Sequence, residues 1–391
     1  MTTASRTAVL VTACICVPAG LASWVFFAAA FRIAPFQDWM VYHTVATLFL
    51  HGDAELILDG PRLTEAINQG QAAWLQVPLA LHPWIYPPLF LVLLLPFGLL
   101  PFGAAYLAFI VSTFAAMVGS LWLWFRTPGG RAGAMVAMML CPASAFTVAV
   151  GQNAFLTSAL ITAGVAMLPR RPAVAGLLLG MLAVKPQFVL MVPVALLAGR
   201  HWRALAAAAA GVTGLVVASL CLGGFDLWTG WFGFMLRQDS AYGDWLAAGR
   251  MHGDSIDAIL SLLGASPTAA TAGQAVASAA AAACVWRAFR HPRAQALRLV
   301  VILGATLLAA PHVGLYDYVM LGVAAIVMLA HVAIGDGVSD RGRPGELLVA
   351  ALAWVSTSIS LPAVWSVGMA SPLVVLALIA CALRHARADD L

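Results

Sequence analysis

Residues 8–43 read AVLVTACICVPAGLASWVFFAAAFRIAPFQDWMVYH, an apolar run followed by a short segment that carries one carboxylate. The run at 8–31 exceeds the roughly 20 apolar residues that cross a membrane, so we expect a retained first transmembrane helix rather than a cleaved signal peptide. Asp38 then falls at the membrane edge, beside Trp39 and Tyr42, which suit that interface. A carboxylate in this position is reachable from water yet lies in a low dielectric, which raises its basicity.

The composition extends this interpretation to the whole chain. Of 391 residues, 62% are hydrophobic and 9% are charged, whereas soluble globular proteins have about 25% charged residues. Further apolar runs lie at 86–125 (broken by Pro96, Pro101 and Gly103), 132–149, 153–168, 172–184, 186–199, 204–223, 268–287, 298–310, 317–334, 347–361 and 363–383. Each must be helical, because lipid satisfies no backbone hydrogen bonds. We therefore expect an all-α polytopic membrane protein, a single domain over 1–391 with about 12–13 transmembrane helices, several of them short, paired or tilted.

The basic residues predict how the chain is oriented. Fifteen of the 20 basic residues recur at every second connection between runs and near both ends, where positive charge marks the cytoplasmic side. Both termini should then be cytoplasmic, with two outer loops at 32–85 and 224–256. The first contains short amphipathic pieces that suit helices along the membrane surface, and the second is rich in Trp, including Trp228, Trp231 and Trp245, with Tyr242 nearby.

Several kinds of site are disfavoured. The six cysteines all lie in apolar runs without a CxxC pair, which indicates packing residues. His43, His51, His82 and His252 lack the spacing of a metal site. No GxxxxGK[ST], GxGxxG or GxSxG motif is present. We expect no metal site, no cofactor and no nucleic-acid partner.

Polar clusters fall on the predicted outer side at five places. They are 38–43, 84–89, 151–153, 185–187 and 311–318. Ionisable and amide groups that gather on one side of a membrane protein indicate a functional site facing the cell exterior or periplasm. Three classes of membrane protein fit the pattern: an enzyme, a transporter or flippase of a lipid-linked saccharide, and a subunit that only binds such a lipid.

The charged members have distinct expected roles. Asp38 is the best general-base candidate, because a sugar hydroxyl must lose its proton as it attacks; otherwise Asp38 caps the following helix. Lys185, the one lysine of the chain, suits a phosphate whose lipid tail lies in the bilayer, or it snorkels at a helix end. His312 could donate to a phosphate oxygen, orient Asp38 or act as an acid, or it is a hydrogen-bonded helix-end residue.

Neutral and aromatic residues complete the candidate set. Gln152 and Asn153 could bind a sugar or phosphate, or cap a helix. Asp317 could bind a sugar hydroxyl or cap the next helix. The remaining substrate-binding candidates are Tyr86, Gln187 and Tyr316.

Five stretches together resemble glycosyltransferase family 87, the polyprenyl-phosphate-mannose-dependent α-1,2-mannosyltransferase-like proteins of the GT-C superfamily. They are FQDWMVYHTVATLFLHGDAELILD (36–59), WIYPPLFLVLLLPFGLLP (84–101), GQNAFLTSALI (151–161), AGLLLGMLAVKPQFVLMVPVALLAGRHWRAL (175–205) and PHVGLYDYVML (311–321). No single motif decides the resemblance, which lies in the ordered set.

The resemblance implies a GT-C-like bundle with periplasmic amphipathic helices in the first outer loop. It implies inverting transfer of mannose or another hexose or pentose from a polyprenyl-phosphate donor to a glycan or glycolipid acceptor, on the periplasmic face of a bacterial inner membrane. Asp38 matches the family's first-loop catalytic acid and would be the base, while Lys185 and His312 match positions near the donor phosphate. Tyr86, Gln152 and Asp317 fall on matching motifs.

Overall fold

The computed structural model describes residues 3–30, 36–241, 254–334, 344–359 and 370–384. Within these residues every regular element is helical. The α-helices are α1 (Thr3–Ala30), α2 (Gln37–His51), α3 (Gly60–Gly70), α4 (Pro88–Gly98), α5 (Phe102–Trp122), α6 (Pro128–Leu140), α7 (Pro142–Val150), α8 (Ala154–Met167), α9 (Pro172–Gly180), α10 (Pro186–Val189), α11 (Met191–Ala198), α12 (Trp202–Ala241), α14 (Ile256–Leu262), α15 (Pro267–Arg290), α16 (Gln295–Ala309), α17 (Val319–Ile334), α18 (Pro344–Ile359) and α19 (Ala370–Arg384). The 3₁₀ turns are η1 (Ala54–Leu56), η2 (Ala72–Trp74), η3 (Met181–Val184) and η4 (Leu315–Tyr318).

Some of the helices have the length and composition of membrane spans. Among the described residues four are long and apolar enough to cross a bilayer, and the bent pair α6 and α7 makes a fifth candidate. Eight further apolar helices are shorter. Large apolar side chains such as Val25, Leu107 and Phe225 are exposed on outward surfaces, as suits contact with lipid. The expected all-α polytopic membrane protein is confirmed, and the number of 12–13 crossings stays a prediction.

Proline divides two of the predicted runs. The run at 132–149 is not one helix: α6 and α7 meet at 57° where Pro142 follows Cys141, because a proline disfavours helical geometry in the residue before it. The run at 86–125 forms α4 and α5, with Pro101 preceding the first residue of α5. The 11 residues of α4 span about 16 Å, too short to cross a bilayer alone.

The predicted outer loop at 224–256 begins as a helix. Gly224, with φ 65°, kinks α12, which then continues to Ala241. Positive φ is readily available to glycine alone. Beyond the kink, Trp231 donates from Nε1 to the Ile85 carbonyl at 3.3 Å and so fastens α12 to the segment before α4. Tyr242 and Trp245 lie outside the described residues.

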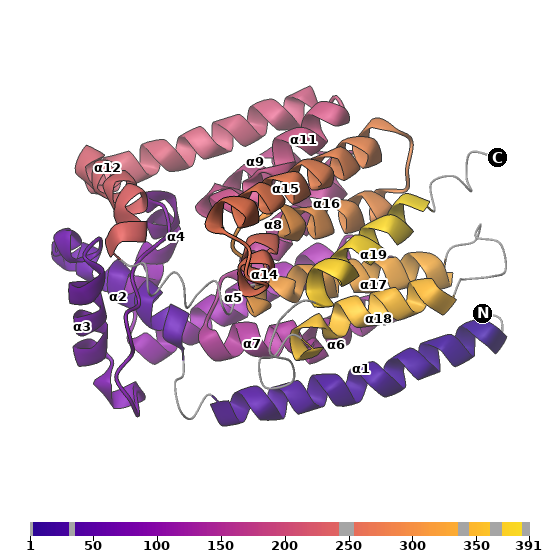
Figure 1. Ribbon diagram of the computed structural model, residues 1–391, viewed down its shortest axis with the longest axis horizontal. Helices are drawn as coiled ribbons and strands as arrows, with labels where there is room; N and C mark the ends of the chain where they lie inside the picture. The colour runs from indigo at the N-terminus through magenta and orange to yellow at the C-terminus, as the bar shows by residue number, and fades with distance from the viewer. Residues whose placement is uncertain (1–2, 31–35, 242–253, 335–343, 360–369, 385–391) are drawn as a thin grey trace.

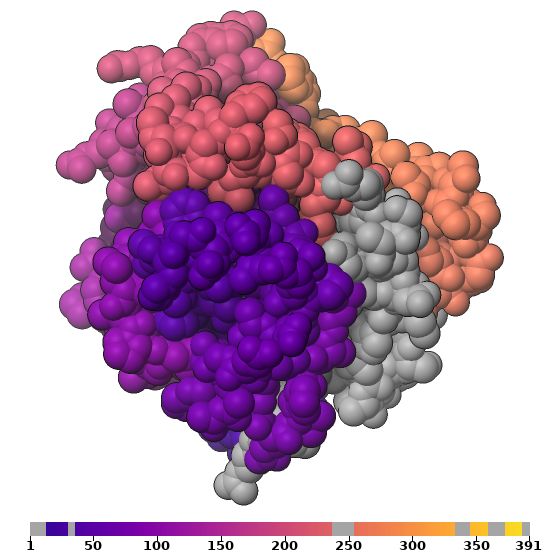
Figure 2. All heavy atoms as spheres, turned by 90° about the vertical axis from the view of Figure 1, so that its left-hand side faces the viewer, coloured from indigo at the N-terminus to yellow at the C-terminus, as the bar shows by residue number. Residues whose placement is uncertain are grey.

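The two ends of the molecule differ. In Figure 1 the short helices α2 and α3 form the left-hand end, and the start of α1, the end of α19 and the α15–α16 connection lie toward the right. Figure 2 looks onto the left-hand end, where the residues around α2 and α3 fill the centre and the last part of α12 lies above them. The predicted first outer loop is therefore far from the arginine-rich α15–α16 connection.

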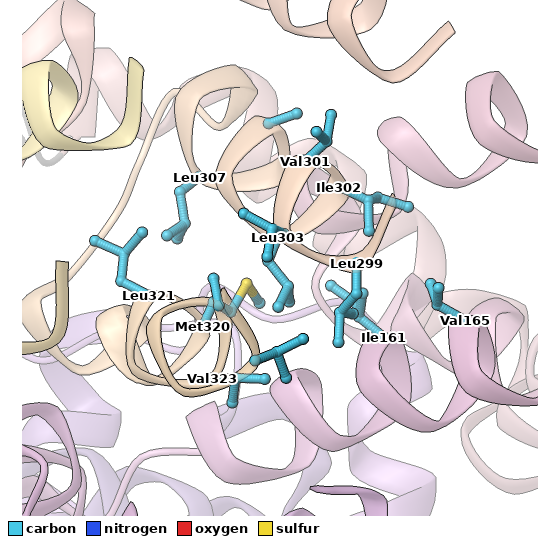
Figure 3. Close-up of a cluster of buried hydrophobic side chains, with 14 of the residues drawn as sticks. Ile161, Val165, Leu299, Val301, Ile302, Leu303, Leu307, Met320, Leu321 and Val323 are labelled. Carbon is cyan, nitrogen blue, oxygen red and sulfur yellow. The ribbon is translucent and has the colours of Figure 1, made fainter. Parts of the chain in front are cut away.

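Two apolar clusters hold the bundle together. The larger cluster contains side chains from helices throughout the range α5 to α19. Figure 3 shows part of it, where Ile161 of α8, Leu303 of α16 and Met320 of α17 lie close together. The smaller is rich in aromatic residues and joins α2 and α3 to α4 and α5. Val184 belongs to the smaller cluster and Phe188 to the larger. Lys185 therefore lies at the boundary between them.

Candidate active site

The backbone places Asp38 in the first turn of α2. Phe36 precedes the helix with φ 56°, and its N–H donates to the Ala149 carbonyl at 3.0 Å. Its buried ring packs edge-on against Tyr106, with 4.3 Å between centroids, which holds this strained backbone in place. The first turn of a helix favours a carboxylate, since its N–H groups are free and its dipole is positive there.

Gly151 brings α7 against the start of α2. It has φ 75°, and a Cβ at this position would collide with the side chain of Trp39. Trp39 is itself fully buried and stacks on Phe109 at 4.9 Å between centroids. Only glycine allows this approach, and the next residue, Gln152, thereby reaches the Asp38 face of α2.

Gln152 is the centre of a polar network. Its Oε1 accepts from the Tyr86 hydroxyl at 2.8 Å and from the Asn153 N–H at 2.9 Å, and it also contacts the Tyr42 hydroxyl. The two tyrosine hydroxyls are 2.7 Å apart. Because the oxygen faces these donors, the amide nitrogen is left to donate to the Asp38 carboxylate, with which the Gln152 side chain hydrogen-bonds.

Lys185 lies in the break between η3 and α10 and is buried. Its Nζ is 2.8 Å from Asp317 Oδ1, the one ion pair within the described part of the chain. The other oxygen of Asp317 accepts from the Gly314 N–H at 3.0 Å. The ammonium also lies 5.0 Å from the ring centroids of both Phe188 and Tyr316. The pair is therefore surrounded by apolar and aromatic groups.

Asp38 belongs to the same electrostatic cluster. Desolvation raises the pKa of this carboxyl, and His82, Lys185 and the hydrogen bond from Gln152 lower it, in that order. The negative charge of Asp317 raises it further. The side chain is half-buried. The structure thus brings together Asp38 and Lys185, which are far apart in the sequence.

His312 lies beside the ion pair. Desolvation lowers the pKa of its imidazole, while the nearby Asp317 carboxylate raises it and Lys185 lowers it. The residue is nevertheless exposed to solvent, and Tyr316 next to the pair is half-buried.

The side chains of two predicted binding residues are not part of the network. Asn153 is fully buried, and its side-chain amide makes no hydrogen bond within the described residues. Gln187 is half-buried, with no hydrogen bond from its side chain among those residues. Both are neighbours in sequence of network members, Gln152 and Lys185. Substrate binding by Asn153 and Gln187 stays a prediction.

One residue of the cluster was missed by sequence reasoning. His82 exerts the largest lowering effect on the pKa of Asp38, ahead of Lys185. The sequence analysis treats His82 only as a possible metal ligand. Among the described residues, no group of three His, Cys, Asp or Glu could hold a metal ion. The available signal was its place two residues before Trp84, at the start of a polar and aromatic motif.

A family model describes the middle of the chain. The model of glycosyltransferase family 87 matches residues 84–311, more than half of the 391 residues. The chain belongs to glycosyltransferase family 87. No curated protein and no solved structure gives a significant match. The predicted family is confirmed, and the mannosyltransferase subtype stays a prediction.

Family membership and the apolar helices together make the protein a membrane glycosyltransferase, which uses a sugar donor and an acceptor. The matched segment contains Tyr86, Gln152 and Lys185. Asp38 and Asp317 lie outside it in sequence, and the contacts described above join them to it.

Proposed function

We propose that this family 87 enzyme transfers a monosaccharide, mannose or another hexose or pentose, from a polyprenyl phosphate to a glycan or glycolipid acceptor, with inversion at the anomeric carbon. One observation carries the proposal: the Asp38 carboxylate and the Lys185 ammonium share an electrostatic cluster at one end of the bundle. A base in this position can take the proton of the attacking hydroxyl, and a cation can stabilise the negative charge of the departing phosphate.

Asp38 acts on the acceptor. The acceptor oxygen forms a bond to the anomeric carbon as the bond from that carbon to the phosphate oxygen breaks, and the hydroxyl proton passes to Asp38. Desolvation makes this carboxylate a stronger base than an exposed one, since it raises the pKa. The Gln152 amide orients it, and the Tyr42 and Tyr86 hydroxyls hold Gln152 in turn.

Lys185 and His312 act on the leaving group. The departing polyprenyl phosphate gains one negative charge, which a nearby ammonium and imidazole N–H stabilise more strongly in the transition state than in the ground state. Removing one such donor typically lowers the turnover rate by about 10²–10³-fold. Tyr316 and Asp317 border this side, because the Lys185 ammonium contacts both.

The membrane position follows from the charge pattern. Arginine-rich connections such as that between α15 and α16 lie opposite the end that holds Asp38 (Figure 1). By the positive-inside rule the termini face the cytoplasm and the site faces the periplasm of a bacterial inner membrane. A donor tail would then remain in the bilayer while its phosphate reaches Lys185.

The test is transfer by the purified enzyme in nanodiscs, with radiolabelled polyprenyl-phosphate mannose, glucose and arabinose as separate donors and membrane glycolipid extract as acceptor. Asp38→Asn should lower kcat/KM for the productive donor by about 10²–10⁴-fold, the usual contribution of a general base. Asp53→Asn is the matched control, since Asp53 is an exposed acid of the same loop, and it should leave the rate unchanged. NMR of the product should show the inverted anomeric configuration.

Two outcomes would overturn the proposal. Full transfer by folded Asp38→Asn would remove Asp38 as the base. Absence of transfer from every polyprenyl-phosphate donor, together with movement of the labelled lipid across the bilayer of a proteoliposome, would favour a flippase of lipid-linked saccharide instead.

A further inference from the structure

Two helices begin side by side at the end of the molecule away from the candidate active site. A Cβ on Gly176 of α9 would collide with the Ala204 carbonyl of α12, and a Cβ on Gly180 would collide with the Ala208 carbonyl. The second contact lies four residues beyond the first in both helices, so α9 and α12 run parallel and in step. Glycine permits this close approach. The connections that precede the two helices therefore lie next to each other.

Both connections carry arginines. Arg170 and Arg171 immediately precede α9. Arg200 stands two residues before α12, and Arg203 lies in the first turn of that helix. All four side chains are exposed. The nine residues of α9 and the four of η3 separate this end from Lys185 by roughly 20 Å of helix length. The four guanidinium groups therefore lie together, far from the candidate active site.

A hydrogen bond brings a third connection to the same place. Gln295 follows α15 and donates from Nε2 to the Val165 carbonyl at 2.6 Å, two residues before α8 ends. The α15–α16 connection, toward the right in Figure 1, is thereby fixed beside the α8–α9 connection. The last turn of α15 contributes two more exposed arginines. We call the six side chains the arginine cluster: Arg170, Arg171, Arg200, Arg203, Arg287 and Arg290.

The described part of the chain supplies no counter-charge to the arginine cluster. Its one ion pair joins Lys185 to Asp317 at the other end. Arg298 lies near the cluster but is occupied, because its Nε and Nη2 donate to the carbonyls of Ala288 and His291 at 3.3 Å and 3.2 Å. The six cluster side chains make no such bond within the described residues. Like charges gathered in this way repel one another and attract anions.

The backbone at Arg200 favours glycine. Its φ is 54°, in the left-handed region. The Arg200 N–H donates to the Leu197 carbonyl at 3.1 Å, and the His201 N–H donates to the Leu196 carbonyl at 2.8 Å. These two bonds define a Schellman motif, in which the left-handed residue is usually glycine. A strained residue of this kind indicates a task for its side chain, and here the strain presents one more guanidinium to the cluster.

Exposed tryptophans place the cluster at the level of lipid headgroups. Trp202, next to Arg203, is 60% exposed, and Trp286, next to Arg287, is 48% exposed. Tryptophan favours the interface between headgroups and hydrocarbon. Leu177, farther along α9, is 45% exposed and suits contact with acyl chains. Guanidinium groups at this level can bind phosphate oxygens in pairs, because their planar fork matches the phosphate geometry.

We propose that the arginine cluster binds the phosphate groups of anionic phospholipids in the leaflet at the end opposite Asp38. The bound headgroups supply the counter-charge that the described part of the chain lacks, and they hold the three connections together. A zwitterionic phospholipid carries its own ammonium next to the phosphate, so an anionic lipid binds more tightly. The inference goes beyond the proposed reaction and does not depend on it.

Lipid binding to the full-length protein in detergent tests the inference. Native mass spectrometry records the first bound lipid during titration with dioleoyl phosphatidylglycerol or dioleoyl phosphatidylcholine. The wild type should bind phosphatidylglycerol at least tenfold more tightly than phosphatidylcholine. Arg171→Gln/Arg200→Gln should weaken phosphatidylglycerol binding roughly 30-fold, about fivefold for each arginine. Arg62→Gln is the control, an exposed arginine of α3 at the other end, and it should leave binding unchanged.

Conservative variants separate charge from structure. Arg171→Lys/Arg200→Lys keeps both charges, so phosphatidylglycerol binding should weaken less than tenfold. If the double glutamine variant does not fold, Arg200→Gly removes one charge together with the backbone strain, and binding should weaken about fivefold. Equal binding of the two lipids by the wild type, unchanged binding in the glutamine variant, or an equal loss in the lysine variant would overturn the inference.

Thermal unfolding scans distinguish a lipid from a soluble anion. Phosphatidylglycerol should raise the Tm of the wild type and of Arg62→Gln, because a ligand that binds the folded state stabilises it. It should raise the Tm of Arg171→Gln/Arg200→Gln by less. Inorganic phosphate should leave the Tm of all three proteins unchanged. An equal rise of the wild-type Tm with inorganic phosphate would overturn the lipid assignment in favour of a soluble anion.

Discussion

Replacing Asp317 by asparagine should leave the ammonium of Lys185 buried without a counter-charge. The two side chains are 4% and 2% exposed, so water cannot replace the lost carboxylate. Removing one partner of a buried ion pair typically costs about 3–5 kcal/mol. The rings of Phe188 and Tyr316, each 5.0 Å from Nζ, contact the ammonium in both proteins and leave this difference unchanged. We therefore expect the free energy of unfolding to fall by about 3 kcal/mol.

A double-mutant cycle isolates the interaction. Lys185→Met should cost a similar amount, because Asp317 then keeps only the Gly314 N–H as a donor. The double variant Lys185→Met/Asp317→Asn buries no charge, and it should be destabilised by less than the sum of the single variants, with a coupling of about 3 kcal/mol. Equilibrium unfolding in detergent, with mixed micelles of increasing SDS content, measures all four proteins.

Exposed Asp226 provides the control, since Asp226→Asn should change stability by less than about 0.5 kcal/mol. Additive effects of the two single variants would refute the reasoning, because they would mean that the ammonium does not sense the carboxylate 2.8 Å away.

Three further variants test the site and its support. Gly151→Ala, at φ 75° and against Trp39, should lower the unfolding free energy by about 3 kcal/mol in the same SDS assay, and an unchanged value would contradict the tight approach of α7 to α2. Tyr86→Phe removes one donor to Gln152, and kcat with the productive donor should fall about fivefold, the equivalent of one hydrogen bond of roughly 1 kcal/mol. Burial raises the pKa of Asp254 from 3.8 to about 7, so wild-type stability should fall as pH rises through this interval, because the unfolded carboxyl ionises first. In thermal unfolding scans, the Tm of Asp254→Asn should equal that of the wild type at acidic pH and should be higher than it at pH values above the pKa of Asp254 in the folded protein. Equal Tm values of the two proteins at every pH would contradict this.

The helices were largely predictable because membranes permit few alternatives. A run at 8–31 became α1, and runs at 153–168 and 268–287 became α8 and α15 with ends within a few residues of those expected. Each such run lacks any other way to satisfy its backbone in lipid. The acidic residue after the first run, expected at the membrane edge, lies in the first turn of the next helix.

The breaks were less visible, because apolar composition alone does not mark them. Pro142 lies inside the run at 132–149 and bends it, although its ring is as apolar as its neighbours. An apolar run at 204–223 followed by an outer loop was expected, yet the chain continues as a helix beyond Gly224 with a changed direction. Whether a glycine ends or only kinks a helix depends on packing farther along, here the contact of Trp231 with Ile85.

The sequence did not predict which distant residues contact each other. Lys185 and Asp317 are 132 residues apart. Both were predicted on the same side of the membrane, but that prediction does not say that they form an ion pair. Asp317 had two expected roles, helix cap or sugar ligand; it accepts from the Gly314 N–H at the start of η4, as a capping residue does, and it also pairs with Lys185. Contacts of this kind depend on how α9 to α11 pack against α16 and η4, and helix periodicity carries no information on that.

The ion pair also bears on how a phosphate could be held and released. An ammonium has three hydrogens, and Asp317 Oδ1 accounts for one of them, so Lys185 can bind a phosphate oxygen without leaving its partner. Because the pair is neutral as a whole, a singly charged phosphodiester gains modest attraction in the ground state. When the bond to the anomeric carbon breaks, the phosphate gains a second charge and the attraction increases, which favours the transition state over the bound substrate. That added negative charge would also raise the proton affinity of Asp38 at the moment when the acceptor hydroxyl loses its proton. Departure of the phosphate and removal of the proton would therefore assist each other.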